Sequence, residues 1–424
     1  MTDQEELTKE RLKETTRESL LNKRIILFGA GAVAKEFYQK YKDILNISHC
    51  VSNIKKEWGS KKFQDELDIL EFRSEDIRET DYLIVCGPVA FRQIELQLLN
   101  CGYKAFQHFI ASEMAACILS GKKIVLFRGS CILRDVYQCI LKSKRFQEQY
   151  APVFGTDNYV DSKFDDRVVY YASRICDYYI YSYRILRQDK IYLITEEDLP
   201  KGCKRISVSN ITFPAYWPQA DPEVRNSNPY LIHPYNIERD MNFQHTVYRL
   251  EDRNLNRMVE EGMSLPEIWK QVSAEDFYSE KEVRRNVKVA FKSLQIAEQF
   301  ADIGVIDFIR ENYDKRLVFQ NFSHLHKCVV WNFVRKIFAA MGIDDGECEQ
   351  LEAESPEYIH HGGDIPVYPS VAKHMGLHWI NEDTTYEIMT YHGVVNMTFR
   401  QYVEHYVEYT QKAQKIMAAW QGEQ

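Results

Sequence analysis

The chain has 424 residues, of which 45% are hydrophobic and 27% are charged, and its formal net charge is −8 at pH 7. This composition excludes a disordered or fibrous chain and predicts a globular protein of two or three domains. The negative charge argues against nucleic acid as a partner, although a local group of Lys and Arg residues could still hold a phosphate.

The cysteines and the N-terminus bear on the cellular compartment. The ten cysteines are scattered and form no Cys-x-x-Cys pair, which indicates free thiols and a cytoplasmic location. The N-terminus is polar and charged, unlike a signal peptide, and no apolar run reaches the roughly 18 residues of a membrane span. We therefore expect any membrane role to be peripheral, at the inner face.

The first part of the chain reads as a small α/β module. Residues 1–22 are predicted to form a charged leader helix, and residues 23–119 a Rossmann-like module. Its first strand, RIILF, runs into GAGAVA and a helix that continues to Lys42. Further strands are predicted at residues 47–51 and in YLIVCG.

The turn after the first strand has the spacing of a dinucleotide-binding loop. Gly29, Gly31 and Ala34 match G-x-G-x-x-A, in which small residues let a pyrophosphate approach a helix start. The acidic residue expected after the second strand is missing, which disfavours NAD. Two roles of the turn stay open: it binds a nucleotide or nucleotide sugar, or it is purely structural. The module is similar to Rossmann-type modules of bacterial sugar-modifying enzymes, which also carry a Trp-Gly pair, here Trp58 and Gly59.

The rest of the chain predicts a second α/β domain at residues 120–400 and a final helix at residues 401–424. Strands are expected at residues 122–127, in CDYYIYS and in KRISVSN, and long helices at residues 282–300 and 328–341. The predicted fold class is thus α/β, with the Rossmann-like module followed by an SGNH- or flavodoxin-like domain that is rich in helices toward its C-terminus. The final helix carries a seam for core or dimer contacts: Tyr402, Tyr406, Tyr409, Ala413, Ile416 and Trp420.

The segment KKIVLFRGSC supplies the first candidate for chemistry. An apolar strand is expected to end at Gly129, which allows a sharp turn, and Cys131 then begins a helix. Backbone amides and the helix dipole at that position favour a thiolate and can hold an oxyanion. Cys131 is therefore a candidate nucleophile. The alternative is a small buried residue that fills a strand–helix corner.

The second candidate lies in VFQNFSHLHK. His324 is predicted in a turn between a strand and a helix, where an imidazole can act as a general base near neutral pH. It could equally cap or fill the turn, and His326 is a weaker competitor. His360 and His361 are adjacent but lack further ligands at suitable spacing, so no metal site is predicted.

A set of landmarks in fixed order resembles the WcbI family of capsular polysaccharide biosynthesis proteins. The landmarks are LFRGSC, ITFPAYWPQADP, LEDRNLNRMVEEGMSLPEIW, VFQNFSHLHK and IPVYPSVAKHMGL, and they cover roughly residues 121–380. Gly129, Cys131 and His324 match the family motifs, whereas the residues flanking them differ. The resemblance implies an SGNH-like scaffold that binds coenzyme A or acetyl coenzyme A.

The resemblance also assigns roles to residues. It implies that Cys131 and His324 are catalytic, and that Gly129, Ser130 and Ile132 form the oxyanion and acyl-donor site. Further substrate or coenzyme A contacts are expected from other residues near the two motifs and the tyrosine-rich strand: Arg134, Tyr183, Arg184, Asn321, Ser323 and His326.

The function implied is a coenzyme A-dependent O-acyltransferase, most simply an acetyltransferase, of capsule or cell-envelope polysaccharide biosynthesis. Its partners would be a sugar or nucleotide-sugar precursor, glycosyltransferases of the same pathway, and a second copy in a homodimer. Either Cys131 takes the acyl group first, or His324 activates the hydroxyl for direct attack on the thioester. An SGNH-like carbohydrate esterase and a non-catalytic assembly subunit that binds coenzyme A or a nucleotide sugar are the alternatives.

Overall fold

Two units of the chain are described, each by itself. The first comprises residues 1–182 and 186–207, and the second residues 183–185 and 208–424. The structure is a computed structural model, and it describes residues 9–422 except 56–57, 60–61, 65, 88–90, 157–166, 184–193, 195–198, 221–251, 358–362 and 391–392.

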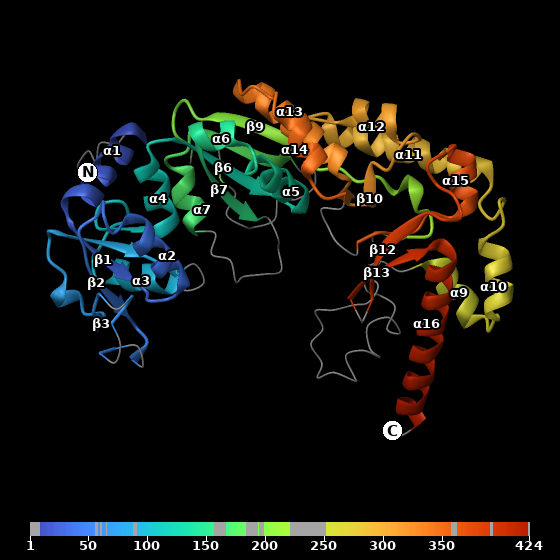
Figure 1. The fold of residues 1–424 in the computed structure, drawn as a ribbon, viewed down its shortest axis with the longest axis horizontal. Coiled ribbons are helices and arrows are strands. Elements are labelled where there is room, and N and C mark those ends of the chain that lie inside the picture. Colours follow the sequence, from blue (N-terminus) through green and yellow to red (C-terminus); the bar gives the residue numbers. More distant parts are fainter. Residues whose placement is uncertain are drawn as a thin grey trace, which may run out of the picture. The chain divides into compact units, whose positions relative to one another are not determined.

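The first unit begins with a five-stranded parallel sheet in the order β3-β2-β1-β4-β5 (Figure 1). This is the order of the first five strands of a Rossmann sheet. The strand order changes direction between β1 and β4, because β2 and β3 are added on one side of β1 and β4 and β5 on the other. The strands are β1 (Arg24–Phe28), β2 (Ile47–Ser52), β3 (Ile69–Glu71), β4 (Asp81–Val85) and β5 (Phe109–Ala111). The helices are α1 (Lys9–Asn22), α2 (Ala32–Tyr41), η2 (Ser74–Asp76), α3 (Phe91–Asn100) and α4 (Ser112–Ser120).

A second sheet of the first unit has the order β7-β6-β8-β9. Its strands are β6 (Lys123–Gly129), β7 (Tyr150–Thr156), β8 (Tyr178–Tyr183) and β9 (Lys204–Ser209). β6 pairs in parallel with both β7 and β8. The order corresponds to 2-1-3-4 of a flavodoxin-like sheet. β7 is added on one side of β6 and β8 on the other, so the strand order changes direction between β6 and β8, a point called the chain reversal below.

Helices cover this second sheet because the inner strands are apolar on both faces. α5 (Cys131–Ile140) and α7 (Arg167–Ser173) both pack on β6 and β7, and the short α6 (Lys144–Gln149) leads into β7 (Figure 1). Within β6 the burial is continuous from Ile124 to Gly129. Such a strand is buried on both sides, as in a parallel sheet between two helical layers.

The second unit is mainly helical. Its helices are η3 (Pro214–Tyr216), α9 (Arg253–Glu260), α10 (Leu265–Val272), α11 (Glu280–Glu298), α12 (Ile306–Asn312), α13 (Lys327–Met341), α14 (Cys348–Glu354), α15 (Pro369–Met375) and α16 (Phe399–Gly422). Two antiparallel hairpins complete it: β10 (Phe319–Asn321) with β11 (His324–Leu325), and β12 (Thr385–Thr390) with β13 (Gly393–Thr398). α13 ends at Gly342, whose φ of +72° is the left-handed conformation that glycine adopts most readily.

A buried carboxyl group links three helices of this unit. Asp252 caps α9 by accepting hydrogen bonds from the backbone amides of Asn254 and Leu255. The Tyr368 hydroxyl donates to the same carboxyl group at 2.9 Å, and the Asp252 amide donates to the Tyr406 hydroxyl of α16 at 3.0 Å. Burial raises the pKa of Asp252 to about 6. The cap is therefore sensitive to pH.

The predicted fold class is confirmed, since parallel sheets and helices build the first unit. The predicted boundary at residue 119 falls between the two sheets, both of which lie within one compact unit, and it stays a prediction. The predicted seam of α16 is buried at Tyr402, Tyr406 and Tyr409, where the helix packs on α9, α10, β12 and β13. The side chains beyond residue 415 and that of residue 413 lie outside the described part.

Candidate active site

Cys131 lies at the edge of the sheet where open α/β folds bind ligands. It is the first residue of α5 and follows β6, the strand on one side of the chain reversal. Ser130 is the N-cap residue and is buried. In such sheets the ligand site is the crevice outside the carboxyl ends of the strands at this point. The structure places the Gly129-Ser130-Cys131 motif at the carboxyl end of β6, beside this point of the sheet.

Gly129 is required here for close packing. A Cβ atom at Gly129 would lie 2.9 Å from Cβ of Leu133 and would also strike the hydroxyl of Ser182 at the end of β8. Its φ is outside the left-handed region. The prediction that glycine serves a sharp turn is therefore corrected, because the missing side chain makes room for α5 and β8.

The environment of Cys131 keeps its thiol protonated. Burial is the largest effect and raises the pKa of Cys131, and the nearby Asp135 carboxylate raises it further. The backbone amides of Ile132 and Cys131 and the charge of Arg134 act in the opposite direction but do not prevail. The expectation that the helix start favours a thiolate is thus wrong for the free protein, because desolvation outweighs the helix terminus.

Two buried charged side chains adjoin this motif, and neither was predicted. Arg128 is 6% exposed in β6, and Asp135 is 3% exposed in α5. The sequence did contain a signal, because both occupy positions in otherwise apolar strand and helix patterns. Arg134, predicted to contact a ligand, is exposed on α5.

His324 is held by a network centred on Asn321. The Asn321 carboxamide oxygen accepts hydrogen bonds from the backbone amides of Ser323 and His324 at 3.1 and 3.0 Å. Its Nδ2 group donates to the carbonyl of Gly363 at 2.7 Å and contacts Nδ1 of His324 at 2.9 Å. Since Nδ2 only donates, Nδ1 of neutral His324 is the acceptor and the proton resides on Nε2.

This tautomer changes the chemistry open to His324. With a proton on Nε2, the neutral ring can donate a hydrogen bond to a carbonyl oxygen or an oxyanion. A general base would need a lone pair at Nε2, and therefore a different arrangement of Asn321. His324 begins β11 of a hairpin rather than lying in an open turn. The Ser323 hydroxyl donates a hydrogen bond to the carboxamide oxygen of Asn321, so both residues stabilise the hairpin.

The remaining predicted contacts are placed as follows. Tyr183 packs against Phe300, with ring centroids 6.0 Å apart. Arg184 lies outside the described residues. Cys131 belongs to the first unit and His324 to the second.

The N-terminal glycine motif lies at the reversal between β1 and β4. Gly29 has a φ of +116°, and a Cβ there would lie 3.2 Å from the carbonyl oxygen of Cys86. Gly31 caps α2, and Ala34 is buried one turn later. β2 ends at Ser52 without a carboxylate, as the sequence indicated. The geometry suits a phosphate-bearing ligand and equally a close strand–helix turn.

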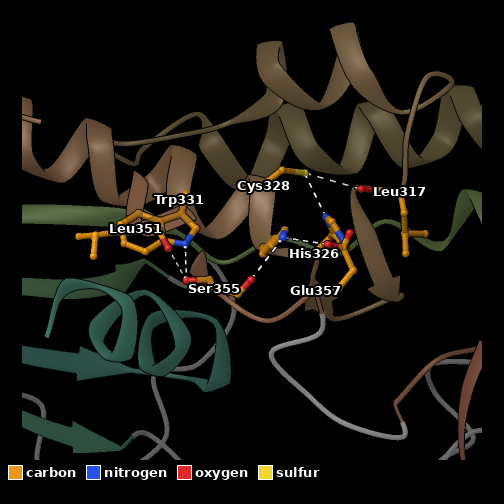
Figure 2. A network of polar contacts seen from close by, with 8 residues as sticks. Leu317, His326, Cys328, Trp331, Leu351, Ser355 and Glu357 are labelled. Carbon is orange, nitrogen blue, oxygen red and sulfur yellow. Dashed lines mark hydrogen bonds and ion pairs between the residues drawn. The ribbon is translucent and has the colours of Figure 1, made fainter. Parts of the chain in front are cut away.

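His326, the weaker of the two histidine candidates, lies in a polar network of its own (Figure 2). Its Nδ1 lies 3.3 Å from Sγ of Cys328, and its Nε2 lies 2.9 Å from Oε1 of Glu357. The other carboxylate oxygen of Glu357 pairs with Nζ of Lys327 at 2.8 Å. Sequence reasoning missed Cys328 and Glu357. The spacing HLHKC before a helix was a signal for the first, and nothing indicated the second.

This network borders a cavity of about 280 Å³ in the second unit. The lining residues are Arg316, Leu317, His326, Lys327, Cys328, Glu352, Glu357, Trp379, Thr384, Thr385 and Tyr386. Burial lowers the pKa of His326, and burial raises that of Cys328 to about 11. At neutral pH both the imidazole and the thiol are therefore uncharged.

Known proteins resemble part of this chain. Residues 181–346 match the family model of the polysaccharide biosynthesis enzyme WcbI. A solved WcbI structure is similar in fold, with 15% sequence identity and a TM-score of 0.50 over 69% of this chain and 90% of that one. That protein is described as a novel polysaccharide biosynthesis enzyme, in a native form without a disulfide bond between coenzyme A and one of its cysteines. No curated protein matches the chain.

Metal-ligand clusters and membrane-spanning helices are both absent from the described residues. In the ranges given above, no three His, Cys, Asp or Glu side chains converge as metal ligands. None of the helices in those ranges combines the length and hydropathy that a bilayer-spanning segment needs. All ten cysteines are free.

Proposed function

We propose that the protein is an O-acyltransferase of polysaccharide biosynthesis that uses acetyl coenzyme A as its acyl donor. One observation carries the proposal: Cys131 follows β6 at the chain reversal of a flavodoxin-like sheet, where ligands bind in such folds. The solved WcbI structure is described with reference to coenzyme A, in a form without a disulfide bond between that molecule and a cysteine, and this mention of coenzyme A supports the choice of donor. The acceptor would be a hydroxyl of a capsule or cell-envelope sugar or of its nucleotide-linked precursor.

The covalent route suits Cys131 best. Because its thiol is protonated in the free protein, the thiol must lose a proton as it attacks the thioester carbonyl. The new thioester forms as the donor's C–S bond breaks, and the released coenzyme A thiolate takes up the proton. Amides at the start of α5 can hold the oxyanion meanwhile. Gly129, Ser130 and Ile132 thereby keep their proposed roles.

His324 is proposed as the second catalytic residue. Its Nε2 proton makes it a hydrogen-bond donor to the reacting carbonyl, in place of the base expected from the sequence. If Cys131 and His324 serve one reaction, the rate losses of Cys131→Ala and His324→Ala will be far from additive in a double-mutant cycle. If the two rate losses are additive in free energy, His324 takes no part in the reaction of Cys131.

The N-terminal module is proposed to hold a nucleotide or nucleotide sugar at Gly29, Gly31 and Ala34. The left-handed Gly29 beside the carbonyl of Cys86 supports this, because it keeps the loop free of side chains at the strand ends. Such a module would bring a sugar precursor to the enzyme. Glycosyltransferase partners, a homodimer and a cytoplasmic, peripheral location remain parts of the same proposal.

Calorimetric titration with coenzyme A and acetyl coenzyme A tests the donor. We expect micromolar binding to the full chain and at least about tenfold weaker binding to Cys131→Ala, because contacts at the thiol are lost. Cys139→Ala is the matched control, since it removes a buried thiol from the same helix. If the unaltered protein binds neither compound, acetyl coenzyme A is not its acyl donor, and the esterase or assembly functions are favoured.

A further inference from the structure

A cysteine, a histidine and a glutamate of the second unit are arranged as a relay of hydrogen bonds. Cys328 lies at the start of α13, His326 is the N-cap residue of the same helix, and Glu357 follows α14. The sulfur–nitrogen distance of 3.3 Å and the nitrogen–oxygen distance of 2.9 Å join them in series. Figure 2 shows the three side chains together.

The partners fix the proton positions in this relay. The Glu357 carboxylate can only accept, so Nε2 of His326 carries a proton and Nδ1 presents its lone pair. The thiol of Cys328 has one proton and two acceptors within reach, Nδ1 of His326 at 3.3 Å and the carbonyl oxygen of Leu317 at 3.6 Å, and the shorter contact is the one to Nδ1. This is the order of nucleophile, base and orienting carboxylate that activates a thiol or hydroxyl in covalent catalysis.

Charges near Cys328 favour a thiolate once the proton has left. Burial has the largest effect and raises the pKa of the thiol, and the Glu352 carboxylate raises it further, whereas Arg316 and the backbone amides of Cys328 and Val329 act to lower it. α13 has 15 residues, so its first turn carries amides without intrahelical acceptors and the positive end of a helix dipole. An oxyanion formed at a carbonyl beside Sγ would meet the same amides.

The cavity beside Sγ has room for a small group. Its volume is about 280 Å³, and Cys328, His326 and Glu357 all line it. Trp379 also lines it, and the Trp379 indole nitrogen is buried without a hydrogen-bond partner in the part of the chain that is described. An unsatisfied N–H donor at a cavity wall calls for an acceptor from a ligand, such as a carbonyl or ester oxygen.

We propose that Cys328, His326 and Glu357 form a second nucleophilic site, which takes the acyl group of a small ester or thioester. Nδ1 of His326 removes the thiol proton, Sγ bonds to the carbonyl carbon, and the bond to the leaving oxygen or sulfur breaks. The leaving group then takes the proton from His326, so no further reactant is needed to form the acyl-enzyme. This site goes beyond the acyltransferase function proposed above and does not depend on it.

Acetylation by p-nitrophenyl acetate tests the site. The full chain would carry Cys101→Ser, which removes an exposed thiol, and Cys131→Ala, which removes the thiol at the start of α5. We expect acetyl on Cys328 by peptide mass spectrometry, with a rate that is flat between about pH 7 and 9 because His326 takes the proton. In His326→Gln the rate falls about 100-fold at pH 7 and rises tenfold per pH unit, following the thiolate fraction alone.

Two controls keep the result interpretable. Cys348 is buried at the start of α14 with a pKa also near 11, but its described contacts include no histidine, so it should be acetylated about 100-fold more slowly. The side chain of Glu357 is 59% exposed, so the Glu357→Gln variant should fold. It should lower the pH-independent rate of Cys328 acetylation, and the pH at which that rate becomes constant should be lower than in the unaltered protein. Equal acetylation of Cys328 and Cys348, or a tenfold rise per pH unit with His326 intact, would overturn the proposal.

Discussion

Each unit of the molecule places a cysteine at the start of a helix, and the two sites differ in what surrounds the sulfur. Cys131 begins α5 beside Asp135, a carboxylate that raises its pKa further. Cys328, in the first turn of α13, likewise has a carboxylate that raises its pKa, Glu352, and an arginine that lowers it, Arg316, but it also contacts the imidazole of His326. Burial dominates at both positions and keeps both thiols protonated.

This difference teaches that a helix start alone does not make a reactive thiolate. Its amides and dipole contribute about 0.3–1 kcal/mol at exposed sites, which desolvation of a buried thiolate easily exceeds. Reactivity then depends on a group that takes the proton when the substrate is in place. In the second unit His326 is that group, whereas at Cys131 we expect the donor's own leaving thiolate to take the proton.

The largest expected effect is on coenzyme A-dependent acyl transfer, which should depend on the thiol of Cys131 and not on that of Cys328. Cys131→Ala should lower coenzyme A-dependent acyl transfer by about 10³-fold or more, as loss of a covalent nucleophile does. Cys328→Ala should change the same rate by less than about twofold, because it belongs to another site. Transfer rates measured with a radiolabelled acetyl group would check both, and equal losses in the two variants would break the distinction.

The second prediction uses the buried cap of the second unit. Folding raises the pKa of Asp252 from 3.8 to about 6, so the folded state binds a proton more tightly than the unfolded chain. This stabilisation is complete below about pH 4 and is lost as pH rises through 6, which amounts to about 3 kcal/mol. Asp252→Asn keeps an acceptor for the α9 amides and should remove that dependence.

Urea unfolding at several pH values, followed by a probe in the second unit, measures this effect. The expected result is a free energy of unfolding that falls between pH 4 and 6 in the unaltered protein relative to Asp252→Asn. Parallel curves for the two proteins would show that Asp252 does not titrate in this range.

The third prediction compares the glycines that follow the central strands of the two sheets. Gly129→Ala should lower the free energy of unfolding by about 1–3 kcal/mol, because the added methyl group strikes Leu133 and Ser182. Gly31→Ala meets nothing within 4 Å, so the expected loss is limited to replacing a favourable N-cap glycine, below about 1 kcal/mol. Thermal unfolding of both variants provides the comparison, and similar losses would contradict the packing role of Gly129.

The smallest expected effect concerns the imidazole of His324. In the unaltered protein its ¹⁵N NMR signals should show a protonated Nε2 and an unprotonated Nδ1, as the Asn321 contacts require. Asn321→Asp replaces the donor by a carboxylate and should move the proton to Nδ1. An Nδ1 proton in the unaltered protein would restore the general-base role expected from the sequence.

Regular elements were predicted well from the sequence because their patterns are local. The strands at Arg24–Phe28 and Lys204–Ser209 and the helix that ends before Gly342 follow directly from apolar runs, helical periodicity and a glycine cap. The short β3 and β5, with three residues each, were not predicted, since so few residues carry no periodicity. The longer β7, β12 and β13 were not predicted either.

The candidate sites were predicted only in part because their energetics are non-local. Cys131 and its place at a helix start could be read from Gly129 and the following periodicity, but its raised pKa depends on burial and on Asp135. His324 was recognised, whereas its tautomer depends on Asn321 and the carbonyl of Gly363. The contact from His326 to Glu357 joins residues 31 positions apart, which no local pattern reveals.

The most direct test of the central claim is to locate the acyl group. The full chain would be incubated with acetyl coenzyme A, quenched at low pH, and its ten cysteines mapped by peptide mass spectrometry. We predict an acetyl thioester on Cys131 that disappears when a sugar acceptor is added. Acetyl found only on Cys328, or on no cysteine while coenzyme A is released, would contradict Cys131 as the thiol that carries the acyl group.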